Sequence, residues 1–324
     1  MTPHEGGWKH SGKVTLRFVA TPQDAGFTRD AVAAGSILEW IDKAGYVCAV
    51  GWSSAYCVTA YVGNVHYTRQ IRPGELVEAS AQIVHTGRTS MHVLVRLSSA
   101  DTRAREYVPA MHCLLVFVAV DDEGRPTEVR EWIPESVEDR TLQENARQRV
   151  ALRQAIHREM KDAVFSGEGT TPRTIFRFLA PPTSANFAGN AHGGTVMRWI
   201  DDAAYACSAG WSSNSATAIY TGGIHFYRPI HIGEIVEVDA LLIHVADGAM
   251  PLSVHVRSAD PRRPTEMKLA TQCMTIFEDR IGVHTVRPVP LLMAEDRALN
   301  ELAQKLVEMR ATLPRVPDGA SARI

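Results

Sequence analysis

The amino-acid sequence predicts an α+β protein made of two tandem copies of one domain, each a buried helix wrapped by an antiparallel sheet. Three observations support this fold class. The chain has 324 residues, more than the about 250–300 that a single core usually holds. Its two halves repeat one another. Each half contains one apolar helical segment followed by several β-branched segments with alternating polarity.

The repeat has a constant offset of 159 residues. Trp40-Ile-Asp42 recurs as Trp199-Ile-Asp201, and ten of the fifteen positions in 40–54 are identical in 199–213. A period this long excludes solenoid repeats, whose units have about 20–50 residues. The chain is therefore a fusion of two copies of the same domain.

The two copies define the domain layout. We expect a first domain over 1–130, a linker over 131–169, a second domain over 170–290, and a C-terminal helix and tail over 291–324. The linker is charged and has an amphipathic pattern from Val137 to Met160, which predicts a helix. Residues 291–312 are its counterpart at the C-terminus.

Within each copy the elements follow from periodicity. A first strand is expected at 14–20 and 174–180, and a loop rich in small and polar residues follows it. In the second copy, apolar side chains at i, i+3, i+4, i+7 and i+8 predict a buried helix from Gly194 to Gly210, and we expect its counterpart in the first copy from Gly35 to Gly51. Alternating segments then predict strands at 56–68, 75–87, 90–100 and 109–121, repeated at 215–227, 234–246, 250–259 and 267–278.

Composition excludes several classes of protein. Lys and Arg total 34 against 36 Asp and Glu, so the net charge of −2 gives no basic face for nucleic acid. The longest apolar run, residues 113–120, is far shorter than the about 20 residues that span a bilayer. The polar N-terminus lacks a secretory pattern, and five cysteines without a C-x-x-C pair are typical of reduced core thiols. We expect a cytoplasmic protein without metal or cofactor, since no metal-ligand spacing or G-x-G-x-x-G motif occurs.

The start of the second apolar helix carries the strongest chemical pattern. The helix is entered through Asn190-Ala-His192-Gly193-Gly194, and two glycines allow a ligand to approach the backbone. Free N–H groups at a helix start stabilise an oxygen that gains negative charge. Asp201 lies seven residues beyond Gly194, about 10 Å along the helix, and cannot serve its own helix start. It is expected to face a cleft shared with another helix, since a buried carboxylate needs a polar partner.

The pattern Asn190-x-His192-Gly193-Gly194-x6-Asp201 resembles that of the hotdog-fold acyl-CoA thioesterases, and the duplication resembles the double-hotdog acyl-CoA hydrolases of the cytosolic type. The resemblance implies hydrolysis of acyl-CoA to a free acid and CoA, without a cofactor. It also implies paired hotdogs with continuous sheets, active sites at their interface, and assembly into a homotrimer. Backbone N–H groups would polarise the thioester carbonyl, and the helix carboxylate would activate water or attack directly.

Carried over by residue, the resemblance implies two composite sites. One joins Asn190 and the His192-Gly193-Gly194 turn to Asp42 of the first copy. The other joins Asp30 and the turn ending at Gly35 to Asp201. The first copy departs from the pattern, because its turn is one residue longer and lacks His-Gly-Gly.

A second asymmetry concerns the hairpin that the resemblance places near CoA. Arg88, Thr89 and Ser90 provide a cation and two hydroxyls in the first copy, whereas the second copy has Asp247 and Gly248 there. We therefore hypothesise complementary degeneration, which leaves one competent site made of the second copy's turn, Asp42 and the first copy's hairpin.

Alternative interpretations remain for these residues and for the protein. Asn190 also fits a helix N-cap, and His192 fits a backbone role in the turn as well as acid–base catalysis. Asp42 and Asp201 also fit solvated or capping carboxylates, and Arg88 fits a surface charge. A hydratase or dehydratase of acyl thioesters, or a non-catalytic acyl-CoA sensor, would be compatible with the same fold. A crotonyl thioester that is hydrated without thiol release would favour the hydratase.

Overall fold

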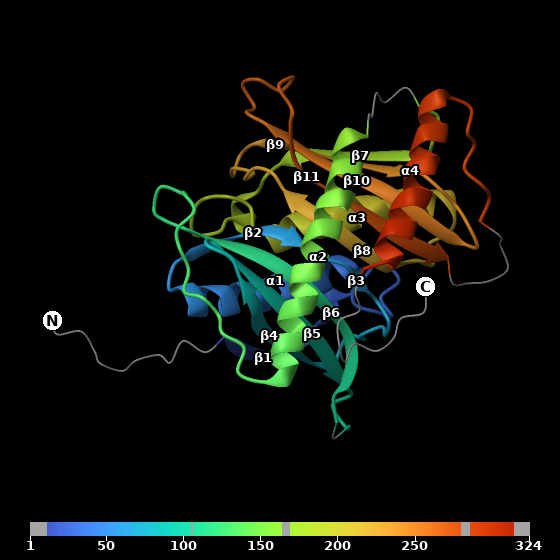
Figure 1. Ribbon diagram of the computed structural model, residues 1–324. Coiled ribbons are helices and arrows are strands. Elements are labelled where there is room, and N and C mark those ends of the chain that lie inside the picture. The colour runs from blue at the N-terminus through green and yellow to red at the C-terminus, as the bar shows by residue number, and fades with distance from the viewer. Residues whose placement is uncertain (1–11, 105, 164–168, 280–285, 314–324) are drawn as a thin grey trace.

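The structure is a computed structural model, and it describes residues 12–104, 106–163, 169–279 and 286–313. Its two halves have the same succession of elements (Figure 1). The first half contains β1 (Lys13–Val19), η1 (Pro22–Asp24), α1 (Ala34–Ser53), β2 (Tyr56–Val62), β3 (Val65–His66), β4 (Leu76–Thr86), β5 (Ser90–Ala100) and β6 (Val108–Val120). The second contains β7 (Arg173–Leu179), η2 (Pro182–Ser184), α3 (Gly193–Trp211), β8 (Ala216–Phe226), β9 (Ile235–Leu242), β10 (Ala249–Ala259) and β11 (Lys268–Asp279). Helix α2 (Val137–Asp162) connects the halves, and α4 (Ala294–Ala311) follows the second.

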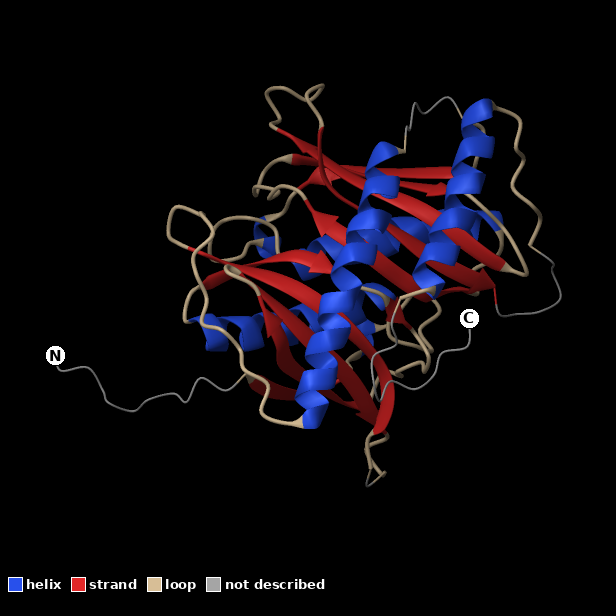
Figure 2. Ribbon diagram, in the orientation of Figure 1, coloured by secondary structure: helices blue, strands red, loops and turns tan. Residues whose placement is uncertain are grey.

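The strands form one continuous antiparallel sheet of eleven strands. Its order is β1-β4-β5-β6-β2-β8-β11-β10-β9-β7, and β3 also pairs with β8. The halves meet where Tyr61 and Val62 of β2 pair with His225 and Ile224 of β8. The expected fold of two tandem hotdogs is thus confirmed: each half has a helix wrapped by an antiparallel sheet (Figure 2).

Alternation along the strands places helices on both faces of the sheet. Val93 and Val95 of β5 belong to the core that contains α1, whereas Leu94 between them packs with Leu142 and Ala146 of α2. Successive side chains of a strand point to opposite faces, so α1 and α2 lie on opposite sides. Helix α2 crosses the boundary between the two halves (Figure 1).

One predicted strand is interrupted. The segment 56–68 was expected to be continuous like its counterpart, but Gly63 and Asn64 separate β2 from β3. A Cβ at Gly63 would lie 2.7 Å from the Leu114 carbonyl oxygen, and the Gly63 N–H donates to that oxygen at 3.0 Å. The chain turns at this close contact, and both β2 and β3 then pair with β8.

Candidate active site

The central helices α1 and α3 pack antiparallel, with the start of each beside the middle of the other. A Cβ at Gly194 would lie 3.0 Å from the Glu39 Cα, and one at Gly35 would lie 2.9 Å from the Arg198 Cα. Any larger residue would push the backbones apart. The glycines therefore set the close approach of the two helices.

This packing brings each predicted aspartate to the start of the opposite helix. The Gly194 N–H donates to Asp42 Oδ2 at 3.0 Å, and the Gly35 N–H donates to Asp201 Oδ2 at 2.7 Å. Both aspartates are buried. Each carboxyl thus accepts a hydrogen bond from one of the orphan N–H groups of a helix N-terminus, across the interface between the halves.

Asp42 faces a cavity of about 600 Å³, here called the Asp42 cavity, which Asn190, His192 and Gly193 also line. The Thr59 hydroxyl donates to Asp42 Oδ1 at 2.7 Å. Burial raises the pKa of Asp42, while the bonds from Thr59 and Gly194 act against this rise. Gly193 is the first residue of α3, and within the described chain its N–H has no hydrogen bond. A carbonyl oxygen could accept from it.

The other polar groups of the Asp42 cavity come from the loop before α3. Asn190 is half-buried, and its Oδ1 atom has no hydrogen-bond partner among the described residues. The Asn186 Oδ1 atom accepts from the backbone N–H groups of Ala188 and Asn190, each at 3.0 Å. Asn186 thus shapes the loop, whereas the Asn190 amide is available to a ligand. His192 is the N-cap residue of α3, but its side chain makes no capping bond.

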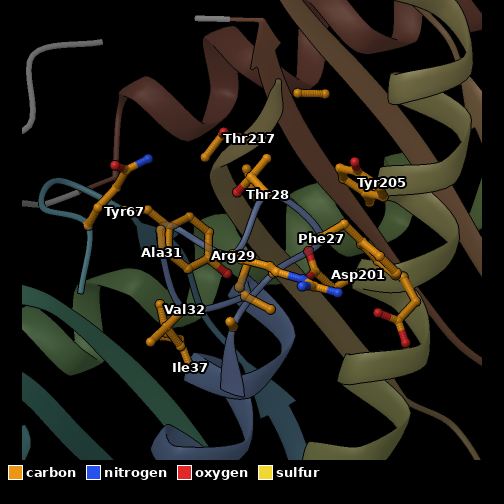
Figure 3. Close-up of a pocket in the computed structure, with 18 of the residues that line it drawn as sticks. Phe27, Thr28, Arg29, Ala31, Val32, Ile37, Tyr67, Asp201, Tyr205 and Thr217 are labelled. Atoms are coloured by element: carbon orange, nitrogen blue, oxygen red, sulfur yellow. The ribbon is translucent and has the colours of Figure 1, made fainter. Parts of the chain in front are cut away.

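Asp201 faces a second cavity of about 700 Å³, here called the Asp201 cavity (Figure 3). Its rim includes Phe27 stacked on Tyr205, with ring centroids 4.6 Å apart. Burial raises the pKa of Asp201 to about 7, and the bond from Gly35 acts against this rise. The threonine that supports Asp42 has no equivalent here, because Ala218 stands where the first copy has Thr59. Tyr67, Phe27, Arg29 and Asp201 are labelled among the residues of this cavity in Figure 3.

The placement of Asp30 corrects the prediction that it corresponds to Asn190. The Gly26 N–H donates to the Ala31 carbonyl at 2.9 Å, as the Asn186 N–H donates to the Asn190 carbonyl at 2.7 Å. Ala31 therefore occupies the position of Asn190. Asp30 is the inserted residue: it is exposed, accepts a hydrogen bond from the Thr28 hydroxyl, and is absent from the lining of the Asp201 cavity.

The hairpin of Arg88, Thr89 and Ser90 lies outside the lining of both cavities. The Arg88 side chain is 78% exposed, and its Nη1 atom lies 3.7 Å from Glu128 Oε1. The Thr89 carbonyl accepts from the Ala119 N–H at 3.0 Å, next to a residue of β6 that lines the Asp42 cavity. The hairpin is thus close to the rim of this cavity, and its contact with CoA stays a prediction.

Two residues with functional geometry were missed from the sequence, Thr59 and Tyr67. Both differ between the copies at the constant offset, where Thr59 corresponds to Ala218 and Tyr67 to Phe226. The two differences can be seen in the sequence, but the sequence does not indicate that these residues line a cavity. In the structure Thr59 lines the Asp42 cavity and Tyr67 lines the Asp201 cavity.

The thiols of this protein lie in its interior. All five cysteines are free and buried, and burial raises the pKa of Cys48 to about 12, so these thiols stay protonated. The described residues contain no group of three or more His, Cys, Asp or Glu side chains suited to a metal ion. Among the described helices, none is both long and apolar enough to cross a bilayer.

The two helix-and-sheet halves, together with the hydrogen bonds from the start of each central helix to the aspartate of the other, define a tandem hotdog protein. A family model, the Thioesterase superfamily, matches the chain twice, at residues 31–105 and 188–265, and the chain belongs to this superfamily. Acyl-coenzyme A thioesterase 11 of Mus musculus is 22% identical over 265 residues, covering 77% of this chain and 44% of that protein. This chain therefore spans less than half the length of the mouse relative.

Two further similarities concern one half of the chain and the overall fold. Protein VdlD of Helicobacter pylori (strain ATCC 700392 / 26695) is 28% identical over 141 residues, which cover 44% of this chain and 80% of that protein. The crystal structure of an acyl-ACP thioesterase from Bacteroides thetaiotaomicron aligns with a TM-score of 0.53 and 10% identity, covering 82% of this chain and 98% of the other. At this identity the structural match supports the fold alone.

Proposed function

We propose that this protein hydrolyses acyl-CoA thioesters to a free carboxylic acid and CoA at the Asp42 cavity. The observation that carries the proposal is the constellation of one buried carboxylate, one supporting hydroxyl and one free helix-start N–H in a single cavity between the described halves. The superfamily assignment and the names of the relatives support thioester hydrolysis as the reaction class.

The geometry suggests how the chain's own groups would act. The thioester carbonyl oxygen would accept from the Gly193 N–H, where the positive end of α3 stabilises the charge that develops on it. Asp42 would take a proton from water as water attacks the carbonyl carbon, or would attack that carbon itself. In the first route the departing thiolate would receive the proton that Asp42 took from water as the C–S bond breaks. In the second route the thiolate would leave as Asp42 forms a mixed anhydride with the acyl group, and water would then hydrolyse this anhydride to release the acid and the free carboxylate.

Thr59 and Asn190 would position these reactants. The Thr59 hydroxyl holds Asp42 Oδ1, so the carboxylate keeps one orientation. The Asn190 Oδ1 atom, without a partner in the described chain, lies in the same cavity and would accept a hydrogen bond from the water or from the CoA arm. Arg88, Thr89 and Ser90 would meet the CoA phosphates from the nearby hairpin.

The test compares Asp42→Asn with Asp201→Asn in a thiol-trapping assay across short, medium, long and aromatic acyl-CoAs. Loss of a general base usually costs about 10²–10⁴ in rate, so Asp42→Asn should lose about a thousandfold in kcat. Asp201→Asn should keep most of the turnover. The opposite pattern would move the reaction to the Asp201 cavity, and no thiol release by the wild type would refute the proposal.

Assembly and location complete the proposal. We propose a homotrimer acting in lipid metabolism in the cytoplasm, as the family resemblance implies. Light scattering after gel filtration should give three times the 35.6-kDa chain mass. Cell fractionation should recover the protein with cytosolic markers, and recovery in an organelle fraction would contradict the location.

A further inference from the structure

The Asp201 cavity keeps the architecture of the proposed active site but lacks three of the groups that the proposed mechanism uses. Ala218 replaces Thr59, Ala31 replaces Asn190, and Ala34 replaces Gly193 as the first residue of the helix. The cavity has nevertheless stayed open at about 700 Å³, within the range of small-molecule sites. The groups that would position water have been lost, while the space for a ligand has been retained.

This cavity has a tyrosine at the position that Phe226 occupies in the Asp42 cavity. Tyr67 is more than nine-tenths buried and lines the cavity. Its hydroxyl lies close enough to that of Thr221 for Thr221 to affect its pKa, but it makes no hydrogen bond of regular length and angle to any described residue. The Thr221 hydroxyl is hydrogen-bonded to that of Thr275 at 3.0 Å. The corresponding residue of the Asp42 cavity is Phe226, so the hydroxyl is not needed to fill the position. A buried donor without an acceptor destabilises the protein unless a ligand provides one.

The protonation states of the groups in this cavity favour hydrogen-bond donation to a ligand over the removal of a proton from water. Burial and the nearby Asp201 raise the pKa of Tyr67 against the opposing effect of the Thr221 hydroxyl, so the Tyr67 hydroxyl stays protonated. Asp201 itself is protonated in a large fraction of molecules near neutral pH. The Ala34 N–H, at the start of α1, is without a hydrogen bond in the described chain. These groups suit a ligand with carbonyl oxygens and apolar parts, and they are poorly suited to activating water.

We propose that the Asp201 cavity binds an acyl thioester without hydrolysing it, and that the Tyr67 hydroxyl donates a hydrogen bond to a carbonyl oxygen of this ligand. The inference takes its ligand class from the proposed function and rests on it in this respect. The protein would then have two ligand sites per chain, one reactive and one for retention.

The test is isothermal titration with a non-hydrolysable analogue in which a methylene group separates the sulfur of CoA from the acyl carbonyl. The wild type should bind two equivalents per chain. Tyr67→Phe should weaken one of the two binding phases about tenfold, as expected for the loss of one hydrogen bond to a neutral acceptor. The reciprocal Phe226→Tyr is the matched control, and any effect of it should fall on the other phase.

Several results would overturn the inference. One equivalent per chain, or two phases that Tyr67→Phe leaves unchanged, would contradict it. A crystal structure of the analogue complex provides a second measurement: ligand density in the Asp42 cavity with an empty Asp201 cavity would also contradict it. Thiol release by the wild type is scored separately. Two equivalents without thiol release would refute the proposed function alone, and thiol release with one equivalent would refute this inference alone.

Discussion

Replacing Asp201 with asparagine should change how the stability of this protein depends on pH. The carboxyl is buried, and its pKa rises from 3.8 to about 7. Between these values the folded chain holds a proton that the unfolded chain releases, so the unfolded state binds fewer protons. The free energy of unfolding therefore decreases as the pH rises through this window. The asparagine side chain would carry no charge, and its amide oxygen could still accept from the Gly35 N–H.

The magnitude follows from the two pKa values. At about 1.4 kcal/mol per tenfold change in proton affinity, the ionised carboxyl costs about 4 kcal/mol at a pH well above 7. From about pH 5 to about pH 8, the wild type should lose about 2.5 kcal/mol more stability than Asp201→Asn.

Urea denaturation at both pH values, followed by tryptophan fluorescence, measures this difference. The matched control is Asp42→Asn, because Asp42 is also buried but Thr59, Gly194 and His192 lower its pKa against the effect of burial. Its variant should show a smaller pH-dependent difference. If the stability of the wild type and Asp201→Asn changed in parallel with pH, the reasoning about Asp201 would be refuted.

Three further substitutions test the site and the core. Thr59→Ala removes a hydrogen bond that lowers the pKa of Asp42, so kcat should fall and the acidic limb of kcat/KM should move to higher pH; an unmoved limb in a pH–rate profile would contradict this role. Gly194→Ala places a Cβ 3.0 Å from the Glu39 Cα and should destabilise the fold by about 1–3 kcal/mol in thermal unfolding, whereas an unchanged midpoint would mean that the helices separate freely. Phe117→Ala empties a fully buried position and should cost about 3–5 kcal/mol in urea denaturation, with a cost below about 1 kcal/mol as the contrary result.

The fold was largely predictable because periodicity and repetition are properties of the linear chain. The apolar spacing located both central helices, and alternation located the strands to within a few residues. The interruption at Gly63 was not predictable. It depends on the carbonyl of Leu114, which lies on a strand that is distant in the sequence.

The resemblance to the double-hotdog hydrolases implied the pairing of helix starts with opposite aspartates. Helix geometry by itself gave less: seven residues of helix separate Gly194 from Asp201, and this distance prevents contact within one helix. The structure places Asp201 against Gly35 instead, and Asp42 against Gly194. The geometry of a regular helix was enough to require a partner on another element.

Patterns along the chain were sufficient to identify the duplication, the two buried helices and the aspartate on each helix, because repetition and periodicity are visible in the linear sequence. Which residues share a cavity depends on the folded structure. In the folded chain the Thr59 hydroxyl is hydrogen-bonded to Asp42, whereas Ala218 lines the cavity that Asp201 faces. Asp30 is exposed, and the buried Tyr67 hydroxyl makes no regular hydrogen bond within the described chain. The physical reason is that a cavity is formed by segments of both halves, and contacts between distant segments are set by packing rather than by spacing along the chain.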